Sequence, residues 1–375
     1  MKVALVCDWF APRIGGIELH LQSLGARLMA AGHDVVVITP TPGETLIGGM
    51  RVRRIHAPLA PGFGFLITAG GVRALGAALA EEHADVAHCH VSIVSPAALG
   101  GAQQAQRLGV PTVLTFHSVV PQTPVLAKAV DFALGTSRWR ARFSAVSQRV
   151  AKDVQPIAGL NEMIVVPNGI DVGFWRTRSA DSASAARRGA NVRLVSVMRL
   201  NQKKRPLALV EIMRRAISSS GTSTNVTLKI AGDGPQRRAL QHAINRARLS
   251  SHIELLGRRT HEDIRILLND SDVFVLPTVR ESFGLAALEA RCAGVPVVAM
   301  AASGVSEFIA HGREGLLAKS DAEFADHVAT LVRDETLRRT IADNNRETLP
   351  PYDWPQVIDQ HLTLYREAIA LRNNV

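Results

Sequence analysis

Cysteine and long apolar runs are scarce in this chain, and their scarcity excludes several classes of protein. Only three cysteines occur in 375 residues, and Cys7, Cys89 and Cys292 lie far apart in apolar runs. This spacing argues against a disulfide scaffold and predicts reduced, buried thiols in a cytosolic protein. The first apolar run ends at Cys7 and is too short for a signal peptide, and no uninterrupted apolar stretch is long enough to span a bilayer. We therefore expect a cytoplasmic protein that is soluble or peripherally bound at the inner face of the membrane.

The charge of the chain is biased toward basic residues. The formal net charge is +10, with 43 Lys and Arg against 33 Asp and Glu. Such a balance is typical of proteins that bind nucleic acid, anionic lipid or anionic small molecules. Nucleic acid is the least favoured partner, because only 5% of the residues are aromatic and no nucleic-acid-binding motif occurs. A polyanionic small molecule and an anionic membrane surface both stay open.

Short β-branched runs alternate with amphipathic stretches along most of the chain. With 47% hydrophobic residues, the chain is long enough for two domains that each bury a core. The alternation predicts the α/β class, with parallel sheets covered by helices. In the first half we expect strands at residues 3–7, 34–39, 52–56, 86–90, 112–116, 143–146 and 163–166. In the second half we expect strands at residues 192–198, 226–231, 253–257, 272–277 and 295–299.

Residues 278–300 carry the most informative pattern, T-V-R-E-S-F-G-L-A-A-L-E-A-R-C-A-G-V-P-V-V-A-M. They follow an apolar strand and predict a loop, a helix and the next strand. We expect Ser282 or the loop before it to cap this helix and Gly294 to end it. Glu281 then lies at the helix N-terminus, which attracts anions, and Glu289 lies about two turns along the helix. A carboxylate repels phosphate but accepts hydrogen bonds from vicinal hydroxyls, so the pattern suits a ligand with both phosphates and sugars.

Glu281 and Glu289, with Phe283, Gly284 and Leu285 between them and A-G-V-P-V-V after them, resemble the E-x7-E motif of retaining GT-B glycosyltransferases. That large family, glycosyltransferase family 4, includes sucrose synthases, bacterial mannosyltransferases and phosphatidylinositol-glycan transferases. The resemblance covers nearly the whole chain and implies a GT-B fold, in which two Rossmann-like domains face each other across a cleft. It implies an acceptor-side domain at residues 1–171, a nucleotide-sugar-binding domain at 172–351 and a helix at 352–375 that crosses back to the first domain. Residues 172–191 lack apolar periodicity, and we expect a hinge or a surface excursion there.

The resemblance implies donor-binding roles for residues of the second half. Glu289 would bind the ribose hydroxyls of the donor, and Glu281 the hydroxyls of the transferred sugar. The turn at Gly232 and Gly234 resembles a segment near the nucleotide. Arg258 follows a strand that resembles the segment whose backbone meets the base.

The family pattern G-R-x4-K-G maps onto Arg199 and Lys204. An arginine fork and a lysine point charge are commonly used to neutralise a diphosphate and to stabilise charge on a leaving group. Two departures occur, because Met198 replaces the usual glycine and R-P follows where the family has Lys-Gly. Lys203 is a second candidate for the lysine role.

Two features of the first half resemble the same family. The pattern D-x-F-x-P-x-x-G-G-x-E-x-H at residues 8–20 resembles its N-terminal signature, so that Gly15 and Gly16 would line the cleft opposite the donor diphosphate. Alone, a glycine pair is also compatible with an ordinary strand-to-helix turn. His117 ends an expected strand at the edge where open α/β sheets bind ligands, and the resemblance places a contact with the donor sugar near this point.

Two motifs invite a metal site, and we expect none at either. His88, Cys89 and His90 follow one another in a strand, where successive side chains point to opposite faces, and no second pair lies at zinc spacing. Asp270 and Asp272 match the D-x-D metal signature of the other glycosyltransferase fold, but they lie where a strand begins. We therefore expect no metal and no cofactor, with the nucleotide-sugar acting as co-substrate.

A basic cluster and an apolar loop offer surfaces for an unidentified acceptor. Arg138, Arg140, Arg142 and Arg149 could hold a phosphorylated or lipid-linked acceptor, or form an ordinary solvated face. The glycine-rich apolar stretch at residues 60–71 could meet a membrane surface or pack on the core. The chain is thus expected to move a sugar from a UDP- or GDP-sugar to a glycan, lipid-linked or small-molecule acceptor in cell-envelope glycan or glycolipid synthesis. The alternatives are a GT-B-like sugar-nucleotide epimerase and a non-catalytic basic protein that binds lipid or nucleic acid.

Overall fold

The structure, a computed structural model, describes residues 1–13, 15–56, 68–92, 95–119, 130–176, 191–220 and 225–373. Its contacts divide the chain into two compact units, Met1–Gly169 with Tyr352–Val375, and Ile170–Pro351. Most of the apolar stretch at 60–71 and most of the expected hinge at 172–191 lie outside the described residues. In the described part of the chain, no helix combines the length and apolar composition that crossing a membrane requires.

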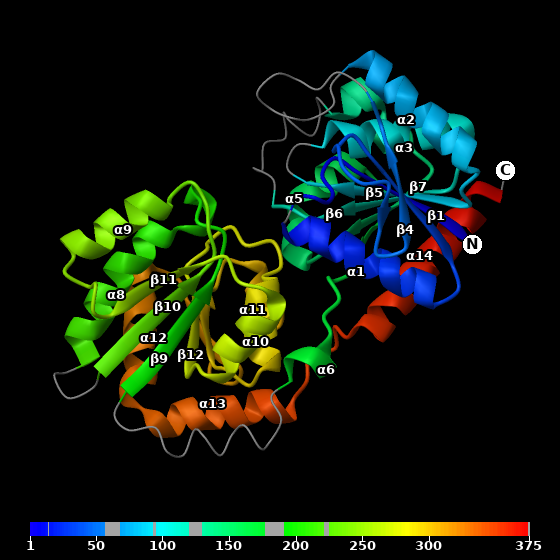
Figure 1. The fold of residues 1–375 in the computed structure, drawn as a ribbon. Helices are drawn as coiled ribbons and strands as arrows, with labels where there is room; N and C mark the ends of the chain where they lie inside the picture. Colours follow the sequence, from blue (N-terminus) through cyan, green and yellow to red (C-terminus); the bar gives the residue numbers. More distant parts are fainter. Residues whose placement is uncertain are drawn as a thin grey trace. The chain divides into compact units, whose positions relative to one another are not determined.

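The first unit is an α/β sheet with helices on both faces. Its strands are β1 (Lys2–Cys7), β2 (Asp34–Thr39), β3 (Leu46–Ile47), β4 (Met50–Arg54), β5 (Val86–Val91), β6 (Thr112–Phe116), β7 (Ala141–Ala145) and β8 (Met163–Val165). Its helices are α1 (Gly16–Ala30), α2 (Ala69–Glu82), α3 (Pro96–Leu108), η1 (Thr136–Arg138), α5 (Gln148–Ala158) and α14 (Trp354–Asn373). The strands of the described residues run in the order β3-β4-β2-β1-β5-β6-β7-β8, with β3 antiparallel to β4. Figure 1 shows α2 and α3 on one side of this sheet and α1 and α14 on the other.

Apolar strands explain why this sheet is covered on both faces. In β1 and β2 every residue after the first is buried, and both sequences read as continuous runs of V, I, L and A that end at Cys7 and Thr39. A parallel sheet needs such strands because helices cover both of its surfaces.

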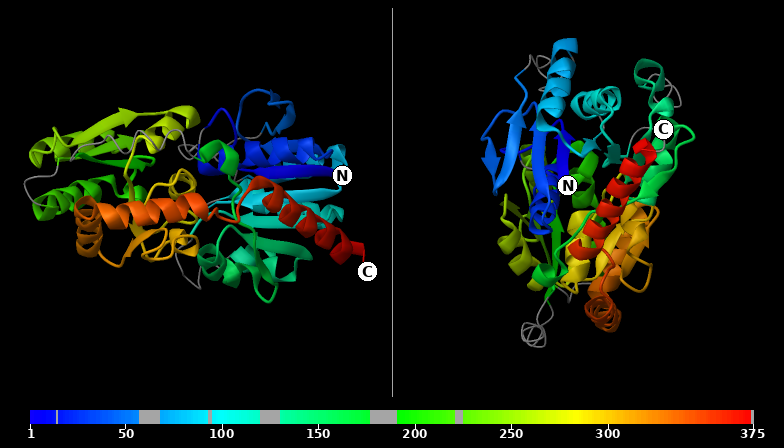
Figure 2. Two further views of the ribbon diagram at one scale, coloured as in Figure 1. Left: turned by 90° about the horizontal axis from the view of Figure 1, so that it is seen from below. Right: turned by 90° about the vertical axis from the view of Figure 1, so that its right-hand side faces the viewer.

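The last helix of the chain completes the core of the first unit. In α14, the side chains of Val357, Leu364 and Tyr365 join the same apolar cluster as Val3 and Leu5 of β1. Figure 2 shows this helix, coloured red, beside strands of the N-terminal part of the chain. The two ends of the chain therefore belong to one folded unit.

The second unit is a parallel sheet of the same kind. Its strands are β9 (Asn191–Val197), β10 (Asn225–Ala231), β11 (Ile253–Gly257), β12 (Val273–Leu276), β13 (Val297–Met300) and β14 (Gly315–Ala318), in the order β11-β10-β9-β12-β13-β14 for the described residues. Its helices are α6 (Val172–Trp175), η3 (Gln202–Lys204), α8 (Pro206–Ser220), α9 (Arg237–Arg246), α10 (His261–Asn269), α11 (Leu285–Cys292), η4 (Gly304–Glu307), α12 (Asp321–Arg333) and α13 (Glu335–Glu347). Helices α8 and α9 lie on one side of the strands and α10 and α11 on the other (Figure 1). The strand order reverses direction between β9 and β12. Open α/β sheets bind ligands at such a point, outside the carboxyl ends of the strands.

Candidate active site

Loops after neighbouring strands of the second unit bring Lys204 and Glu281 into contact. Because β9 and β12 are parallel neighbours, their carboxyl ends meet at one edge of the sheet. The loop after β9 forms η3, in which the Asn201 side chain accepts a hydrogen bond of 3.0 Å from the Lys204 backbone N–H. The loop after β12 carries Glu281, whose carboxylate forms an ion pair with the Lys204 ammonium. The two side chains are 26% and 11% exposed, so the pair is partly shielded from water.

Arg199 and Lys203 lie on the same loop after β9 and are exposed. The Arg199 guanidinium has no hydrogen-bond or ion-pair partner in the described residues. Lys204 rather than Lys203 is therefore the lysine that reaches Glu281, while the Arg199 charge is available to an anionic ligand.

Two glycines allow the loop after β10 to pack closely on the loop after β9. Gly232 has φ +135°, and a Cβ there would lie 1.8 Å from the carbonyl oxygen of Met198. A Cβ on Gly234 would lie 2.5 Å from the carbonyl oxygen of Leu200, whose N–H donates to the Asp233 carbonyl at 3.0 Å. Both positions thus require glycine for the packing of one loop on the other, before any ligand is considered.

The loop that carries Glu281 packs on the segment after β13. The Gly304 N–H donates to the Glu281 carbonyl at 2.9 Å, and a Cβ on Gly304 would lie 2.2 Å from the Ser282 carbonyl oxygen. Helix α11 begins at Leu285, its N-cap is Gly284 at φ +99°, and no side chain caps it. The expectation that Ser282 or the loop before it caps the helix is therefore wrong, because a left-handed glycine separates Ser282 from the first turn. In that turn the Ala287 N–H donates to the Gly284 carbonyl at 2.9 Å, and the N–H groups before it are left for another acceptor.

The other residues expected to bind the donor differ in burial. Phe283 is 3% exposed and packs on Phe308, with ring centroids 5.6 Å apart. Leu285 is partly buried at the start of α11, and Arg258 is exposed just after β11. Phe283 therefore supports the loop from within the core, whereas Arg258 is accessible to a ligand.

Glu289 is a carboxyl group without a partner on α11. It is partly buried, and its carboxyl has no hydrogen bond or ion pair to the described residues. Burial raises the pKa of Glu289 to about 8 from an ordinary 4.5. An apolar environment disfavours the charged form, so a ligand that offers hydroxyl donors would stabilise the carboxylate.

Comparisons with known proteins agree with this arrangement. The sequence model for "Glycosyltransferase Family 4" matches residues 14–174, and that for "Glycosyl transferases group 1" matches residues 178–348. The chain belongs to the group 1 glycosyltransferases of the family 4 type. It is 25% identical to the GPI3 subunit of phosphatidylinositol N-acetylglucosaminyltransferase from Saccharomyces cerevisiae, over 97% of this chain and 82% of that protein. It is 27% identical to glycogen synthase from Mycobacterium tuberculosis, over 98% of this chain and 95% of that enzyme.

The fold of this glycosyltransferase is GT-B. HepE from Anabaena, solved in complex with UDP, superimposes with a TM-score of 0.76 at 22% identity, over 97% of this chain and 99% of that one. Two Rossmann-like parallel sheets in one chain are the architecture that the E-x7-E resemblance implies, so the expected fold class is confirmed.

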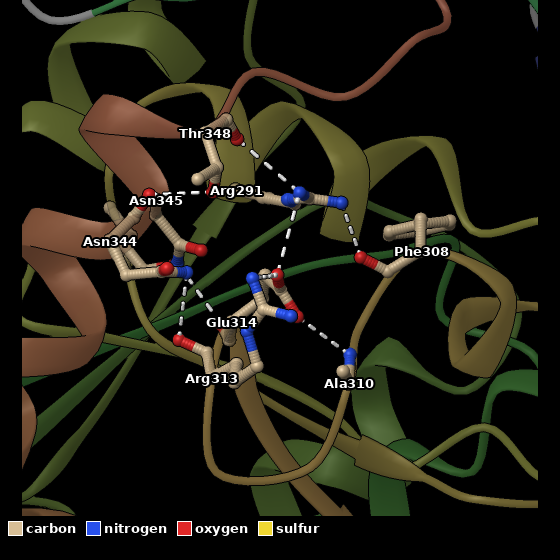
Figure 3. A network of polar contacts seen from close by, with 9 residues as sticks. Arg291, Phe308, Ala310, Arg313, Glu314, Asn344, Asn345 and Thr348 are labelled. Atoms are coloured by element: carbon tan, nitrogen blue, oxygen red, sulfur yellow. Dashed lines mark hydrogen bonds and ion pairs between the residues drawn. The ribbon is translucent and has the colours of Figure 1, made fainter.

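A buried arginine anchors helix α11 of this glycosyltransferase. Arg291 lies two residues beyond Glu289, and Figure 3 shows its guanidinium between two carbonyl groups and a carboxylate. It donates to the carbonyls of Phe308 and, at 3.3 Å, Thr348, and lies 3.7 Å from the Glu314 carboxylate. Arg291 and Glu314 are 7% and 6% exposed. Since a buried charge pair is stable only with good geometry and further hydrogen bonds, this network fixes α11 and with it Glu289.

In the first unit, His117 belongs to a cluster of buried histidines. It follows β6, is 6% exposed, and its Nε2 shares a hydrogen bond of 2.9 Å with Nδ1 of His90. The rings of His20 and His361 lie close by, and the Nδ1 atoms of these two residues have no hydrogen-bond partner in the described residues. Burial is the main cause that holds the pKa of each of these histidines below its ordinary value, so they are neutral at pH 7.

This cluster was not predicted from the sequence. The spacing of His88 and His90 was the available signal, because residues two apart in a strand share one face. Their ring centroids are 3.9 Å apart. Among the described residues, no group of His, Cys, Asp or Glu has the geometry of a metal site.

The glycine pair at the start of α1 is only partly open. Gly15 is the N-cap of α1, and a Cβ there would lie 2.4 Å from one carboxylate oxygen of Glu18. The other oxygen of this carboxylate lies 3.3 Å from Nε of Arg13. Gly16 is exposed, and a Cβ on it would meet no atom within 4 Å. Of the two glycines, Gly16 thus leaves its backbone accessible to a phosphate, whereas the Glu18 carboxylate lies against Gly15.

Asp270 and Asp272 hold an arginine. The Arg193 side chain forms ion pairs with both carboxylates, and its backbone N–H donates to Asp272 at 2.8 Å. This contact ties the start of β9 to the turn before β12. In the structure, the D-x-D motif is a strand-entry turn.

Proposed function

We propose that this glycosyltransferase is retaining and metal-independent and takes its sugar from a nucleotide diphosphate donor held by the second unit. The observation that carries the proposal is the convergence of Lys204 and Glu281 beside the uncapped N-terminus of α11. That edge offers cations and free N–H groups to a diphosphate and a carboxylate to sugar hydroxyls. A sugar diphosphate gives Lys204 a phosphate partner and Glu281 hydroxyl donors, so it can replace the ion pair that these residues form with each other.

The transfer breaks the bond between the sugar C1 and the leaving phosphate oxygen and forms a bond between C1 and an acceptor oxygen. Negative charge develops on the phosphate, where Arg199 and Lys204 would stabilise it. Such a preorganised group lowers the activation free energy by roughly 3 kcal/mol. Retention would follow from attack on the face that the phosphate leaves, with the phosphate oxygen taking the acceptor proton.

The charge on the leaving diphosphate would be offset by side chains, without a metal ion. Support comes from Arg199, whose guanidinium is exposed and unpaired in the described residues, and from Lys204. The carboxylates of Asp270 and Asp272 are turned to Arg193. The proposal needs no separate cofactor, because the nucleotide-sugar is a co-substrate and its nucleotide is the leaving group of the transfer.

Relatives indicate which donors and acceptors to test first. HepE was solved with UDP and with UDP-glucose, and this makes UDP-sugars the first donors to test, followed by GDP-sugars. The yeast relative is named for transfer of N-acetylglucosamine to phosphatidylinositol, so a lipid-linked acceptor is the first acceptor class.

The experiment combines donor binding with product analysis. Wild type is heated with UDP, GDP, ADP and their sugar conjugates, and the nucleotide that raises Tm is used for transfer with and without EDTA. We expect one nucleotide to stabilise the protein, transfer to persist in EDTA, and NMR of the product to show the anomeric configuration of the donor. Arg199→Ala should lower kcat by about 10²-fold to 10³-fold at unchanged Tm. An inverted product, or activity lost with EDTA and restored by a divalent metal, would refute the corresponding part of the proposal.

We also propose that the first unit contacts an anionic membrane through the surface formed by Phe132, Arg138, Arg140 and Leu160. Phe132 and Leu160 are 95% and 104% exposed. Asp131, next to Phe132, accepts a hydrogen bond from the Ser137 N–H, and a Cβ on Gly159, next to Leu160, would lie 3.1 Å from the Ser137 Cβ, so the two apolar side chains come from neighbouring segments. Arg138 and Arg140 are exposed beside them. Exposed apolar side chains among cations are typical of peripheral membrane binding.

Not every arginine of the expected basic cluster belongs to this surface. Arg142 lies 3.3 Å from Glu367, and Arg149 lies 3.6 Å from Asp153. Their charges are therefore largely offset within the protein.

Sedimentation with vesicles of anionic and of zwitterionic lipid tests this surface. Replacing Phe132 and Leu160 by Asp should abolish binding to anionic vesicles. Ile266→Asp, at a side chain 57% exposed in the second unit, serves as the control and should bind as wild type does. Equal binding of all three proteins would place the membrane contact elsewhere.

A further inference from the structure

Arg205 adopts a backbone conformation that glycine would adopt at lower cost. It follows η3 with φ 57° and ψ 43°, and Pro206 begins α8 directly after it. A side chain in the left-handed region costs roughly 1–2 kcal/mol, and such strain persists where surrounding structure enforces it. The strained residue is adjacent to Lys204, and contacts of its side chain compensate for the strain.

The Arg205 guanidinium joins three segments at the carboxyl edge of the second sheet. Nη1 donates to the Pro277 carbonyl at 3.0 Å, and Nη2 donates to the Asp321 carboxylate at 2.6 Å. Pro277 directly follows β12 and begins the loop that carries Glu281, while Asp321 is the first residue of α12, after β14. One side chain therefore ties the loops after β9, β12 and β14 together.

A second contact runs parallel to the first. The Thr278 hydroxyl lies 3.5 Å from the carbonyl oxygen of Lys204, at the limit of a hydrogen bond. The two loops that carry the Lys204 and Glu281 side chains are thus joined by two contacts between a side chain and a backbone carbonyl, as well as by the ion pair. The ion pair would be exchanged when a sugar diphosphate binds, whereas the Arg205 contacts involve no proposed donor ligand.

We propose that Arg205 is a positioning residue that holds the Lys204 backbone in register with the Glu281 loop during the transfer. This inference rests on the donor site proposed above. A lysine side chain has a flexible four-carbon stem. Holding it in one place costs up to about 2 kcal/mol of free energy in lost rotamer entropy. A fixed backbone limits the positions that the ammonium samples, and stabilisation of the leaving phosphate depends on those positions.

Arg205→Gly tests this role, because glycine accepts the left-handed backbone and removes only the side chain. Arg248→Gly is a matched control, since Arg248 also has φ 57° but is exposed and has no side-chain partner in the described residues. Each full-length variant is assayed for Tm and for kcat and KM of the donor. We expect Arg205→Gly to lower kcat about tenfold, with KM within about threefold of wild type and Tm unchanged within about 2 °C. Arg248→Gly should keep wild-type kcat.

Two further variants distinguish positioning from a general structural role. Asp321→Ala should lower kcat less than Arg205→Gly does, because it removes only one of the two Arg205 contacts. The double variant should be no slower than Arg205→Gly alone, because Arg205→Gly already removes the contact with Asp321. Arg205→Lys should recover part of the lost kcat, since an ammonium can reach one of the two acceptors.

The outcomes separate this inference from the proposed function. Arg205→Gly with wild-type kcat, or losses that multiply in the double variant, would overturn the positioning role while the transferase stands. A fall in kcat only in proportion to a fall in Tm would also overturn it. Wild type that neither binds nor turns over any nucleotide-sugar would overturn the proposed function and this inference with it.

Discussion

Replacing Glu289 by glutamine removes the titration of this carboxyl group and leaves its shape almost unchanged. Burial raises the pKa of Glu289 to about 8, against 4.5 for an unperturbed glutamic acid. Between these values the folded chain holds a proton that the unfolded chain releases. Stability therefore falls in wild type as the pH rises through this window, and Glu289→Gln escapes that loss.

The size of the effect follows from the two pKa values. At 1.36 kcal/mol per pKa unit, the advantage of glutamine grows by about 2.5 kcal/mol between pH 5 and pH 7 as an upper limit. Since Glu289 is partly rather than fully buried, solvent reduces this figure, and we expect about 1 kcal/mol. For a domain of ordinary size, this corresponds to roughly 2–4 °C in Tm.

Thermal unfolding of wild type and Glu289→Gln across this pH range is the assay. Glu254→Gln, at an exposed position on β11, controls for the loss of one surface charge. The Tm of Glu289→Gln relative to wild type should rise with pH, whereas that of Glu254→Gln should not. A difference between Glu289→Gln and wild type that stays constant from pH 5 to pH 8 would refute the raised pKa.

Two further predictions concern the histidine cluster and the glycine loop. His361 is 1% exposed and faces His20, His88 and Tyr365. Burial lowers the pKa of His361 to about 3. The unfolded chain therefore binds a proton that the folded chain does not, and wild type loses stability as the pH falls below about 6.5. His361→Phe should regain about 2 kcal/mol at pH 5 relative to pH 7.5 in urea unfolding, and an equal effect at both pH values would contradict this. Gly232→Ala should destabilise the second unit by more than about 2 kcal/mol, because its Cβ would meet the Met198 carbonyl oxygen at 1.8 Å. Gly312→Ala, at φ +83° with open space around its Cβ, should cost only about 1 kcal/mol, and similar losses for both would show that the contact with Met198 is unimportant.

Buried parallel strands could be located from the sequence because their apolar runs are continuous. The strands expected at residues 34–39, 112–116 and 253–257 coincide with β2, β6 and β11. The strand expected at residues 52–56 begins two residues earlier, as β4 at Met50. Gly48 and Gly49, both with positive φ, form the turn of a β3–β4 hairpin that the sequence analysis overlooked.

The end of helix α11 could be predicted from the sequence, because a glycine forms the C-terminal cap through its backbone. Gly294 was expected to end α11, and it does so at φ +78°, with its N–H bonded to the Arg291 carbonyl and the next N–H to that of Ala290. The start of the same helix could not be read in this way. Ser282 is a favourable N-cap by residue type, but packing of its backbone on Gly304 leaves Gly284 as the cap.

The polar contacts that position the site connect residues far apart in the sequence, and for this reason no motif reported them. Arg205 and Asp321 are 116 positions apart, and the hydrogen bond between His88 and Tyr365 joins residues separated by 277 positions. The E-x7-E motif identifies which side chains can contact a donor, but how precisely these side chains are positioned depends on such distant anchors. The strained backbone of Arg205 and the two acceptors of its guanidinium place it among those anchors. A substitution at Arg205 can therefore change catalysis through Lys204 without touching the donor.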